Sequence, residues 1–230
     1  MIKLYLFDIE GTTTDINFVH KVLFPYSEKH MEEYVLTHHQ SNEVVKKAVE
    51  MVRETVQEEE KQEIGLNEVI AKLLQWIKED RKHPALKEIQ GCIWDAGYTN
   101  NHFKGHVYHD VKPLFQKIVK SDAKVGIYSS GSEHAQKLIF GYSEEGDLTP
   151  YISCYFDTRV GGKRKKTSYE QIAQKTGFDP KEIHFFSDVK EELQAASEAG
   201  FTVTLVCRDS SCESAPFDCV TDFTALVDKV

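Results

Sequence analysis

Apolar residues follow two different spacings along this chain. A short apolar run from Ile2 to Phe7 is followed at once by acids, a glycine and threonines, which is typical of a buried strand that ends in a turn. Between residues 16 and 104 the spacing becomes helical, with apolar side chains every three or four residues along one face. The first two stripes are Val45, Val49, Val52 and Val56, and then, after Gly65, Val69, Ile70, Leu73, Leu74 and Ile77. We interpret these stripes as a core between helices.

The chain after Val111 alternates short apolar runs with helical segments. The expected strands are residues 124–128, 154–157, 183–186 and 202–207, and the helices between them begin at Glu133, Ser168 and Glu191. This alternation is typical of a parallel sheet with crossover helices. Because the first strand precedes the helical block, we predict an α/β fold: a Rossmann-like parallel sheet with an inserted α-helical cap. The predicted core is residues 1–15 plus 105–230, and the predicted cap is residues 16–104.

Charge and composition limit the classes of molecule that this chain is expected to bind. The chain has 230 residues, with 28 Lys and Arg against 37 Asp and Glu, and its formal net charge of −9 disfavours nucleic acid and anionic membranes. No stretch approaches the roughly 20 apolar residues of a membrane span, and the N-terminus runs directly into a strand. Five cysteines form no C-x-x-C pair and are expected to be reduced. We therefore expect a cytoplasmic monomer that acts on a small molecule.

Two acids mark the end of the first strand. Asp8 and Glu10 lie in the octapeptide FDIEGTTT, where Gly11 lets the backbone turn tightly beside a phosphate or metal. One carboxylate could attack while the other handles a proton. Taken alone, the octapeptide also fits a strand end with solvated acids.

Polar residues follow the next two strands as well, and parallel strands present their carboxyl ends at one edge of a sheet. Ser129 and Ser130 precede a helix, where they could bind an anion or simply cap the helix. Lys163 follows two glycines and opens the densest basic cluster of the chain. Such a cluster is either a solvated surface or a site that neutralises a phosphate.

The fourth strand is followed by another acid, Asp188. Alone it would cap a helix, but beside Asp8 it would complete an oxygen site for magnesium. Glu192, on the following helix, is a weaker candidate. It would contact the residues that bind magnesium and substrate, and not the magnesium or the substrate itself.

The combination of these strand ends resembles the haloacid dehalogenase superfamily of phosphotransferases. In that superfamily the first aspartate attacks phosphorus, the acid two residues later protonates the leaving oxygen, and magnesium screens the anions. The resemblance implies one Mg²⁺ ion per chain. The implied catalytic residues are Asp8, Glu10 and Lys163, the implied phosphate contacts are Ser129, Ser130 and Lys163, and the implied magnesium ligands are Asp8, Glu10 and Asp188.

Within that superfamily the chain resembles one group more closely than the others, because Glu10 stands where Asp is usual. With Phe18 and residues 23–26 downstream, the chain is similar to the enolase-phosphatases of methionine salvage. Further matching stretches are residues 86–94, 97–98, 127–132, 135–138, 140–148, 156–158, 161, 163 and 168–169. Two departures are the absence of an acid in residues 164–166 and Asn in place of a frequent Gly in residues 98–101.

This resemblance implies a bifunctional enzyme. It would enolise 2,3-diketo-5-methylthiopentyl-1-phosphate and then dephosphorylate it to 1,2-dihydroxy-3-keto-5-methylthiopentene, an acireductone. Cap aromatics could form a slot for the methylthio tail or pack the cap's own core; they are Phe18, Phe24, Trp94 and Tyr98. The alternatives are a generalist sugar-phosphate or nucleotide phosphatase of the same superfamily and a non-catalytic phosphate-binding module.

Overall fold

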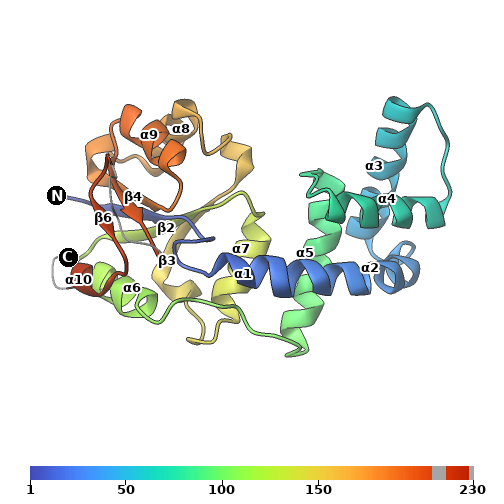
Figure 1. Cartoon of the computed structure of the whole chain (residues 1–230), viewed down its shortest axis with the longest axis horizontal. Helices are drawn as coiled ribbons and strands as arrows, with labels where there is room; N and C mark the ends of the chain where they lie inside the picture. The colour runs from blue at the N-terminus through green and yellow to red at the C-terminus, as the bar shows by residue number, and fades with distance from the viewer. Residues whose placement is uncertain (209–215, 228–230) are drawn as a thin grey trace. The chain divides into compact units, whose positions relative to one another are not determined.

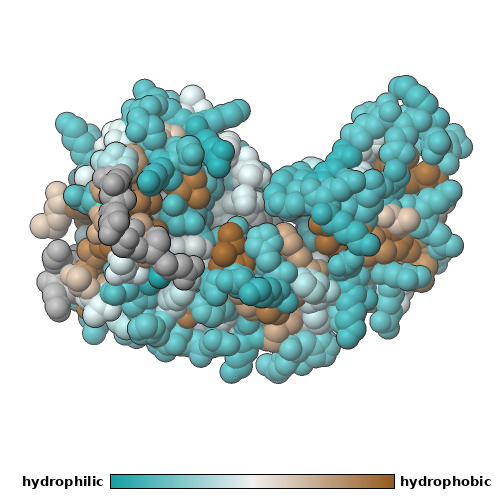
Figure 2. All heavy atoms as spheres, in the orientation of Figure 1, coloured by the Kyte–Doolittle hydropathy of each residue, from teal (hydrophilic) through white to brown (hydrophobic). Residues whose placement is uncertain are grey.

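The computed structural model describes residues 1–208 and 216–227, and the chain divides into two compact units. The first unit combines Met1–Phe18 with Lys104–Val230, and the second is Val19–Phe103. Each unit has a hydrophobic core of its own. Polar residues cover most of the visible surface of each unit (Figure 2).

A parallel sheet forms the centre of the first unit. Its strands in the described residues are β1 (Leu4–Phe7), β2 (Lys124–Tyr128), β3 (Ile152–Phe156), β4 (Ile183–Ser187), β5 (Thr202–Val206) and β6 (Cys219–Val220). Their order is β3-β2-β1-β4-β5-β6, and every neighbouring pair is parallel. Phe7, the last residue of β1, pairs with Ile127 of β2 and with Phe186 of β4. The residues that follow these three strands therefore meet at one edge of the sheet.

Helices cover both faces of this sheet (Figure 1). Helices α8 (Lys166–Thr176) and α9 (Lys190–Glu198) lie on one side, and α6 (Val111–Lys120) and α10 (Thr224–Val227) lie on the other. Leu6 belongs to the core beneath α8 and α9, whereas the ring of Phe7 packs on Phe115 of α6. Successive strand residues point to opposite faces, so both faces of β1 are buried. The remaining elements are α1 (Ile16–Phe18), α7 (Glu133–Gly141) and the short 3₁₀ turns Thr149–Tyr151, Thr158–Val160 and Pro180–Glu182.

The predicted fold class is confirmed, with small differences in element bounds. Strand β3 begins at Ile152, two residues before the expected start, because Ser153 is exposed on this edge strand and interrupts the apolar run. Helices α8 and α9 begin at Lys166 and Lys190, slightly earlier than expected. Strand β6 was not predicted, since two residues carry no periodic signal.

The second unit consists of helices. A π-helical turn, Val19–Leu23, leads into α2 (Phe24–His38), followed by α3 (Glu43–Glu60), α4 (Leu66–Lys78) and α5 (Pro84–Thr99). The predicted stripe of α3 is buried as expected. On α4, Leu74 is partly buried and packs against the core of this unit, and Trp76, which the predicted stripe did not include, is buried in it.

Two of the aromatics suggested for a substrate slot pack within this second unit. Tyr98 is 1% exposed, and its ring contacts that of Phe103 at 4.5 Å between centroids. The Trp94 indole N–H donates to the carbonyl of Leu23 at 2.8 Å. These contacts favour the alternative in which Tyr98 and Trp94 stabilise the core of their own unit.

Helices in the described part of the chain lack the length and apolar character that a membrane crossing requires. Cys92, Cys154 and Cys207 are free thiols. Cys219 is disulfide-bonded, so the expectation of five reduced cysteines is wrong at this position. Disulfide pairing depends on proximity in space, which the spacing of cysteines in the sequence does not reveal.

Candidate active site

The strand ends of β1, β2 and β4 open into a pocket of about 410 Å³ within the first unit. All the site residues named from the sequence line it: Asp8, Glu10, Ser129, Ser130, Lys163, Asp188 and Glu192. Arg164 and Lys165 line it too. Four carboxylates and three basic side chains thus face one pocket, an arrangement suited to a small anion bound together with a cation.

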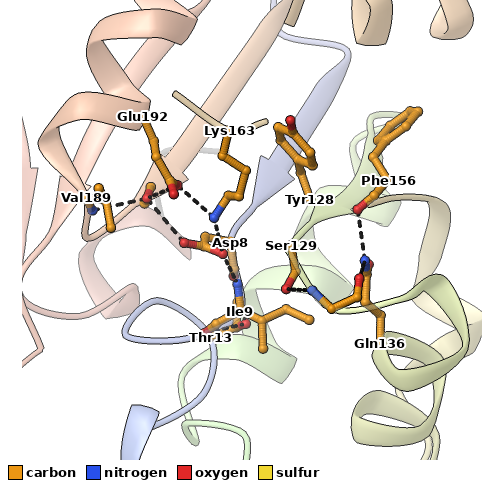
Figure 3. A network of polar contacts seen from close by, with 12 residues as sticks. Asp8, Ile9, Thr13, Tyr128, Ser129, Gln136, Phe156, Lys163, Val189 and Glu192 are labelled. Carbon is orange, nitrogen blue, oxygen red and sulfur yellow. Dashed lines mark hydrogen bonds and ion pairs between the residues drawn. The ribbon is translucent and has the colours of Figure 1, made fainter. Parts of the chain in front are cut away.

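Lys163 joins two buried acids in this pocket. Its Nζ lies 2.6 Å from Asp8 Oδ1 and 2.7 Å from Glu192 Oε2, and these three side chains point toward one another in Figure 3. Asp8 Oδ1 also accepts a hydrogen bond from the Ile9 amide at 2.7 Å. The carboxylate of Asp8 is therefore held in one orientation by two donors.

Charge interactions in this cluster oppose the effect of burial. Burial alone would lower the pKa of Lys163, but the charges of Asp8 and Glu192 outweigh it, and the net shift is upward. Burial, followed by the charge of Asp8, raises the pKa of Glu192, although Lys163 acts in the opposite direction. Lys163 is consequently a permanent ammonium, and it is the counter-charge that permits two carboxylates to lie beside it.

Ser187, at the end of β4, is a residue of this cluster that the sequence reasoning missed. Its buried Oγ lies 3.0 Å from Glu192 Oε2 and 3.3 Å from Asp8 Oδ2, and it accepts from the Val189 amide at 3.1 Å. A hydroxyl has one hydrogen, so it donates to only one of the two carboxylates at a time. The only signal in the sequence is a serine directly before Asp188 at a strand end.

The turn that carries Glu10 is closed by hydrogen bonds. The amides of residues 12–14 all donate to the carbonyl of Ile9, at 3.2, 2.9 and 2.8 Å, and the Gly11 amide donates to the carbonyl of Thr14 at 2.8 Å. The Thr13 hydroxyl donates to the carbonyl of Asp8 at 2.9 Å. The backbone around Glu10 is therefore fixed relative to Asp8.

Gly11 and Asp188 approach each other at the centre of the site. Gly11 has φ +70°, and a Cβ added there would lie 2.3 Å from Asp188 Oδ2. Only glycine allows this backbone conformation and this close approach without strain. Asp188, the acid that follows β4, is therefore packed directly against the turn after β1.

The carboxyl of Asp188 titrates at an unusually high pH. Desolvation inside the concave pocket is the larger cause and the negative charge of Asp8 the second, and together they raise the pKa of Asp188 to about 7. The Asp188 residue is nevertheless exposed to the solvent in the pocket. Solvent weakens such an effect, but its direction follows from two acids sharing one site. A cation between them would relieve this repulsion.

The donors at this edge of the sheet fit magnesium. Mg²⁺ takes oxygen ligands and is commonly held by one or two carboxylates with waters and substrate phosphate. Asp8 and Asp188 supply two carboxylates on neighbouring strand ends. Across residues 1–208 and 216–227, no three His, Cys, Asp or Glu side chains are grouped to hold a metal ion.

The loop after β2 provides hydrogen-bond donors for an anion. The Ser129 Oγ accepts from the Gly131 amide at 3.1 Å, which leaves the hydroxyl hydrogen available to donate into the pocket. Ser132, rather than Ser129 or Ser130, caps α7 by accepting from the Ala135 amide at 3.2 Å. Ser132 therefore caps α7, whereas Ser129 and Ser130 line the pocket.

Comparisons with known proteins identify the family of this chain. A family model described as haloacid dehalogenase-like hydrolase matches residues 2–200. Enolase-phosphatase E1 from Klebsiella oxytoca is 47% identical over 91% of this chain and 90% of that protein. Enolase-phosphatase E1 from Marinobacter nauticus is 44% identical over the same shares of the two chains.

Solved structures show the same relationship. The UTR4 protein from Saccharomyces cerevisiae superposes with a TM-score of 0.82 at 30% identity, over 97% of this chain and 99% of that one. L-2-haloacid dehalogenase from Xanthobacter autotrophicus shares the fold, with a TM-score of 0.58 at 17% identity over 99% and 98% of the two chains. The resemblance inferred from the strand-end motifs is confirmed. The chain belongs to the haloacid dehalogenase-like hydrolase family and, within it, to the enolase-phosphatase E1 proteins.

Proposed function

We propose that this chain is a bifunctional enolase and phosphatase of methionine salvage. It converts 2,3-diketo-5-methylthiopentyl-1-phosphate into the acireductone 1,2-dihydroxy-3-keto-5-methylthiopentene and phosphate. The observation that carries the proposal is the position of Asp8, whose carboxylate lines the pocket beside Glu10 and Asp188 and is oriented by Lys163. The enolase-phosphatase E1 relatives, at 44% and 47% identity, supply the substrate class.

The phosphatase step uses Asp8 as nucleophile. A bond forms between its carboxylate oxygen and phosphorus, while the bond from phosphorus to the substrate's C1 oxygen breaks. Glu10 gives its proton to the departing oxygen. Water then hydrolyses the aspartyl phosphate and restores the carboxylate. Ser129, Ser130 and Lys163 hold the phosphate through hydrogen bonds and charge.

The enolase step comes first. A base accepts the proton that leaves the phosphate-bearing carbon, and the neighbouring ketone oxygen gains negative charge until it is protonated to the enol. The Lys163 ammonium is the buried cation available to stabilise that oxygen. The same lysine thus serves both halves of the reaction, as an electrostatic partner of the enolate and then of the phosphate.

We assign one Mg²⁺ to Asp8 and Asp188, with Glu10 contributing to the site. When bound, the ion supplies positive charge that stabilises the phosphate and the developing oxyanion. Glu192 acts behind these residues by pairing with Lys163.

The unit Val19–Phe103 is proposed to act as the cap that recognises the methylthio tail. The chain enters it at Val19, three residues after the pocket residue Ile16, and returns to the first unit at Lys104. The chain is proposed to act as a monomer. A cytoplasmic location is part of this proposal; the free thiols of Cys92, Cys154 and Cys207 support it, whereas the disulfide-bonded Cys219 does not.

A coupled assay tests this function. Acireductone absorbance and free phosphate are followed together from the diketo substrate, with Mg²⁺ and with a chelator in its place. We expect both products with Mg²⁺ and a loss of both with the chelator. Phosphate release without acireductone, or equal rates with common sugar phosphates, would instead indicate a generalist phosphatase. Binding of phosphate without turnover would indicate a regulatory module.

Glu10→Asp is expected to change the balance between the two steps. The side chain loses one methylene and about 1.5 Å of reach, and the hydrogen-bonded turn leaves the backbone no freedom to compensate. We expect the ratio of enolase to phosphatase rate to change by roughly fivefold or more. The matched control is Glu191→Asp, an exposed acid of α9, which should leave the ratio unchanged. Equal losses in both steps would contradict the proposed double role of Glu10.

A further inference from the structure

Arg208 reaches from the end of β5 to the turn that carries Glu10. Its Nε and Nη2 donate to the carbonyl oxygen of Thr12 at 2.9 and 2.8 Å, and its Nη1 donates to Asp110 Oδ2 at 2.7 Å. Only 6% of the Arg208 side chain and 2% of the Asp110 side chain are exposed. One buried side chain therefore binds both the turn after β1 and the residue that precedes α6.

Aromatic rings hold the guanidinium group in place. Its Cζ lies 4.2 Å from the ring centre of Tyr108 and 4.6 Å from that of Phe223. Asp110 Oδ2 accepts a second hydrogen bond, from the Phe223 amide at 2.5 Å. A planar group that stacks between two rings and donates through a fork has the properties of arginine and not of lysine.

The segment bound by Arg208 is continuous with the catalytic turn. Thr12 lies two residues after Glu10, and its own amide donates to the Ile9 carbonyl, which closes the turn. Gly11, between Glu10 and Thr12, packs against the carboxylate of Asp188. A shift of the Thr12 carbonyl therefore changes the position of Glu10 and the fit of Gly11 against Asp188 together.

We propose that Arg208 is a positioning residue for Glu10. It fixes the turn so that the Glu10 carboxyl reaches the reacting atoms, and it does so without touching the substrate, since it is absent from the pocket lining. This inference rests on the proposed role of Glu10 in the reaction. An arginine that only stabilised the fold would lower stability and leave the balance of the two steps unchanged.

A double-mutant cycle with Arg208→Lys and Glu10→Asp separates these roles. Lysine keeps the charge but loses the fork, and we expect kcat to fall about 10-fold with KM changed less than about 2-fold. The ratio of the two steps should shift in the direction that Glu10→Asp shifts it. In the Glu10→Asp background, Arg208→Lys should lower kcat by a much smaller factor than it does in the native chain, because both substitutions act on the same group. Arg53→Lys, in the second unit, is the control and should have no effect.

Additive losses, or an unchanged ratio of the two steps, would overturn the proposal. Thermal unfolding of each variant shows whether it is folded. If Arg208→Lys is unfolded, Asp110→Asn retains Arg208 but weakens its anchor, and it should shift the same ratio by a smaller factor; no shift would overturn the proposal. If the native chain releases phosphate without forming acireductone, the proposed function fails. The cycle measured on phosphate release alone then still decides whether Arg208 acts through Glu10.

Discussion

Replacing Asp8 by Asn is expected to lower phosphate release by about 10⁴-fold or more, because no other group at the site can take over the attack on phosphorus. The substitution leaves the surroundings nearly unchanged. The amide oxygen of Asn can still accept from the Ile9 amide, and Lys163 keeps its partner Glu192 at 2.7 Å. The measurement is the rate of phosphate release from the diketo substrate with Mg²⁺ present.

The fold of this variant should remain intact. Loss of the Asp8 charge removes one of the three causes that raise the pKa of Asp188, so the remaining acids repel each other less. We expect the free energy of unfolding to change by no more than about 1 kcal/mol. Asp122→Asn, an exposed aspartate outside the pocket, is the matched control and should retain full activity. Phosphate release within tenfold of the native rate would show that Asp8 is not the nucleophile.

The location of the site could be predicted from the sequence, because a parallel sheet places the carboxyl ends of its strands at one edge. Asp8, Ser129 and Asp188 each follow an apolar run, and the alternation of strands and helices places these positions at one edge. The helical stripe of Val45 to Val56 was equally readable, since its period of three to four residues is local. These features depend on neighbours in sequence, where a pattern can record them.

Contacts between residues far apart in the sequence could not be predicted, because no local pattern of residues records them. Ser187 and Asp8 are separated by 179 positions, and Arg208 and Thr12 by 196. Serine and arginine are common after strands, so neither residue stood out before the strands were placed side by side. Lys163 was expected to face a phosphate, but its pairing with Glu192 depends on the way α9 packs beside the loop after β3. Contacts of this kind follow from tertiary packing.

Replacing Lys163 by Met is expected to remove activity and to destabilise the fold in a pH-dependent way. The Lys163 side chain is 10% exposed and its ammonium lies within 2.7 Å of two carboxylates, so its loss leaves Asp8 and Glu192 buried without a counter-charge. Breaking a buried pair in this way costs about 3–5 kcal/mol at a pH where both acids are ionised. Loss of one electrostatic donor lowers turnover by about 10²–10³-fold.

The direction of the pH dependence follows from the acids that remain. Burial and the charge of Asp8 raise the pKa of Glu192 in the folded state, and Lys163 opposes this shift, so without Lys163 the folded pKa of Glu192 rises further above its unfolded value near 4. Acids with a raised folded pKa favour the fold most at pH values below the unfolded pKa, and that stability is lost as the pH rises through the folded pKa. The free energy of unfolding of Lys163→Met should therefore lie furthest below that of the native chain at pH 8 and closer to it at pH 5. Urea unfolding without magnesium, at both pH values, measures this difference.

Lys166→Met is the matched control for this prediction. Lys166 belongs to the same basic cluster, but its side chain is 50% exposed and pairs with Glu170 at 3.2 Å on one face of α8. An exposed pair of this kind contributes at most about 0.5 kcal/mol, so the control should resemble the native chain at both pH values. If Lys163→Met lost the same stability at pH 5 as at pH 8, the loss would come from packing and not from charge. In that case Lys163 could not be the counter-charge that permits Asp8 and Glu192 to lie beside it.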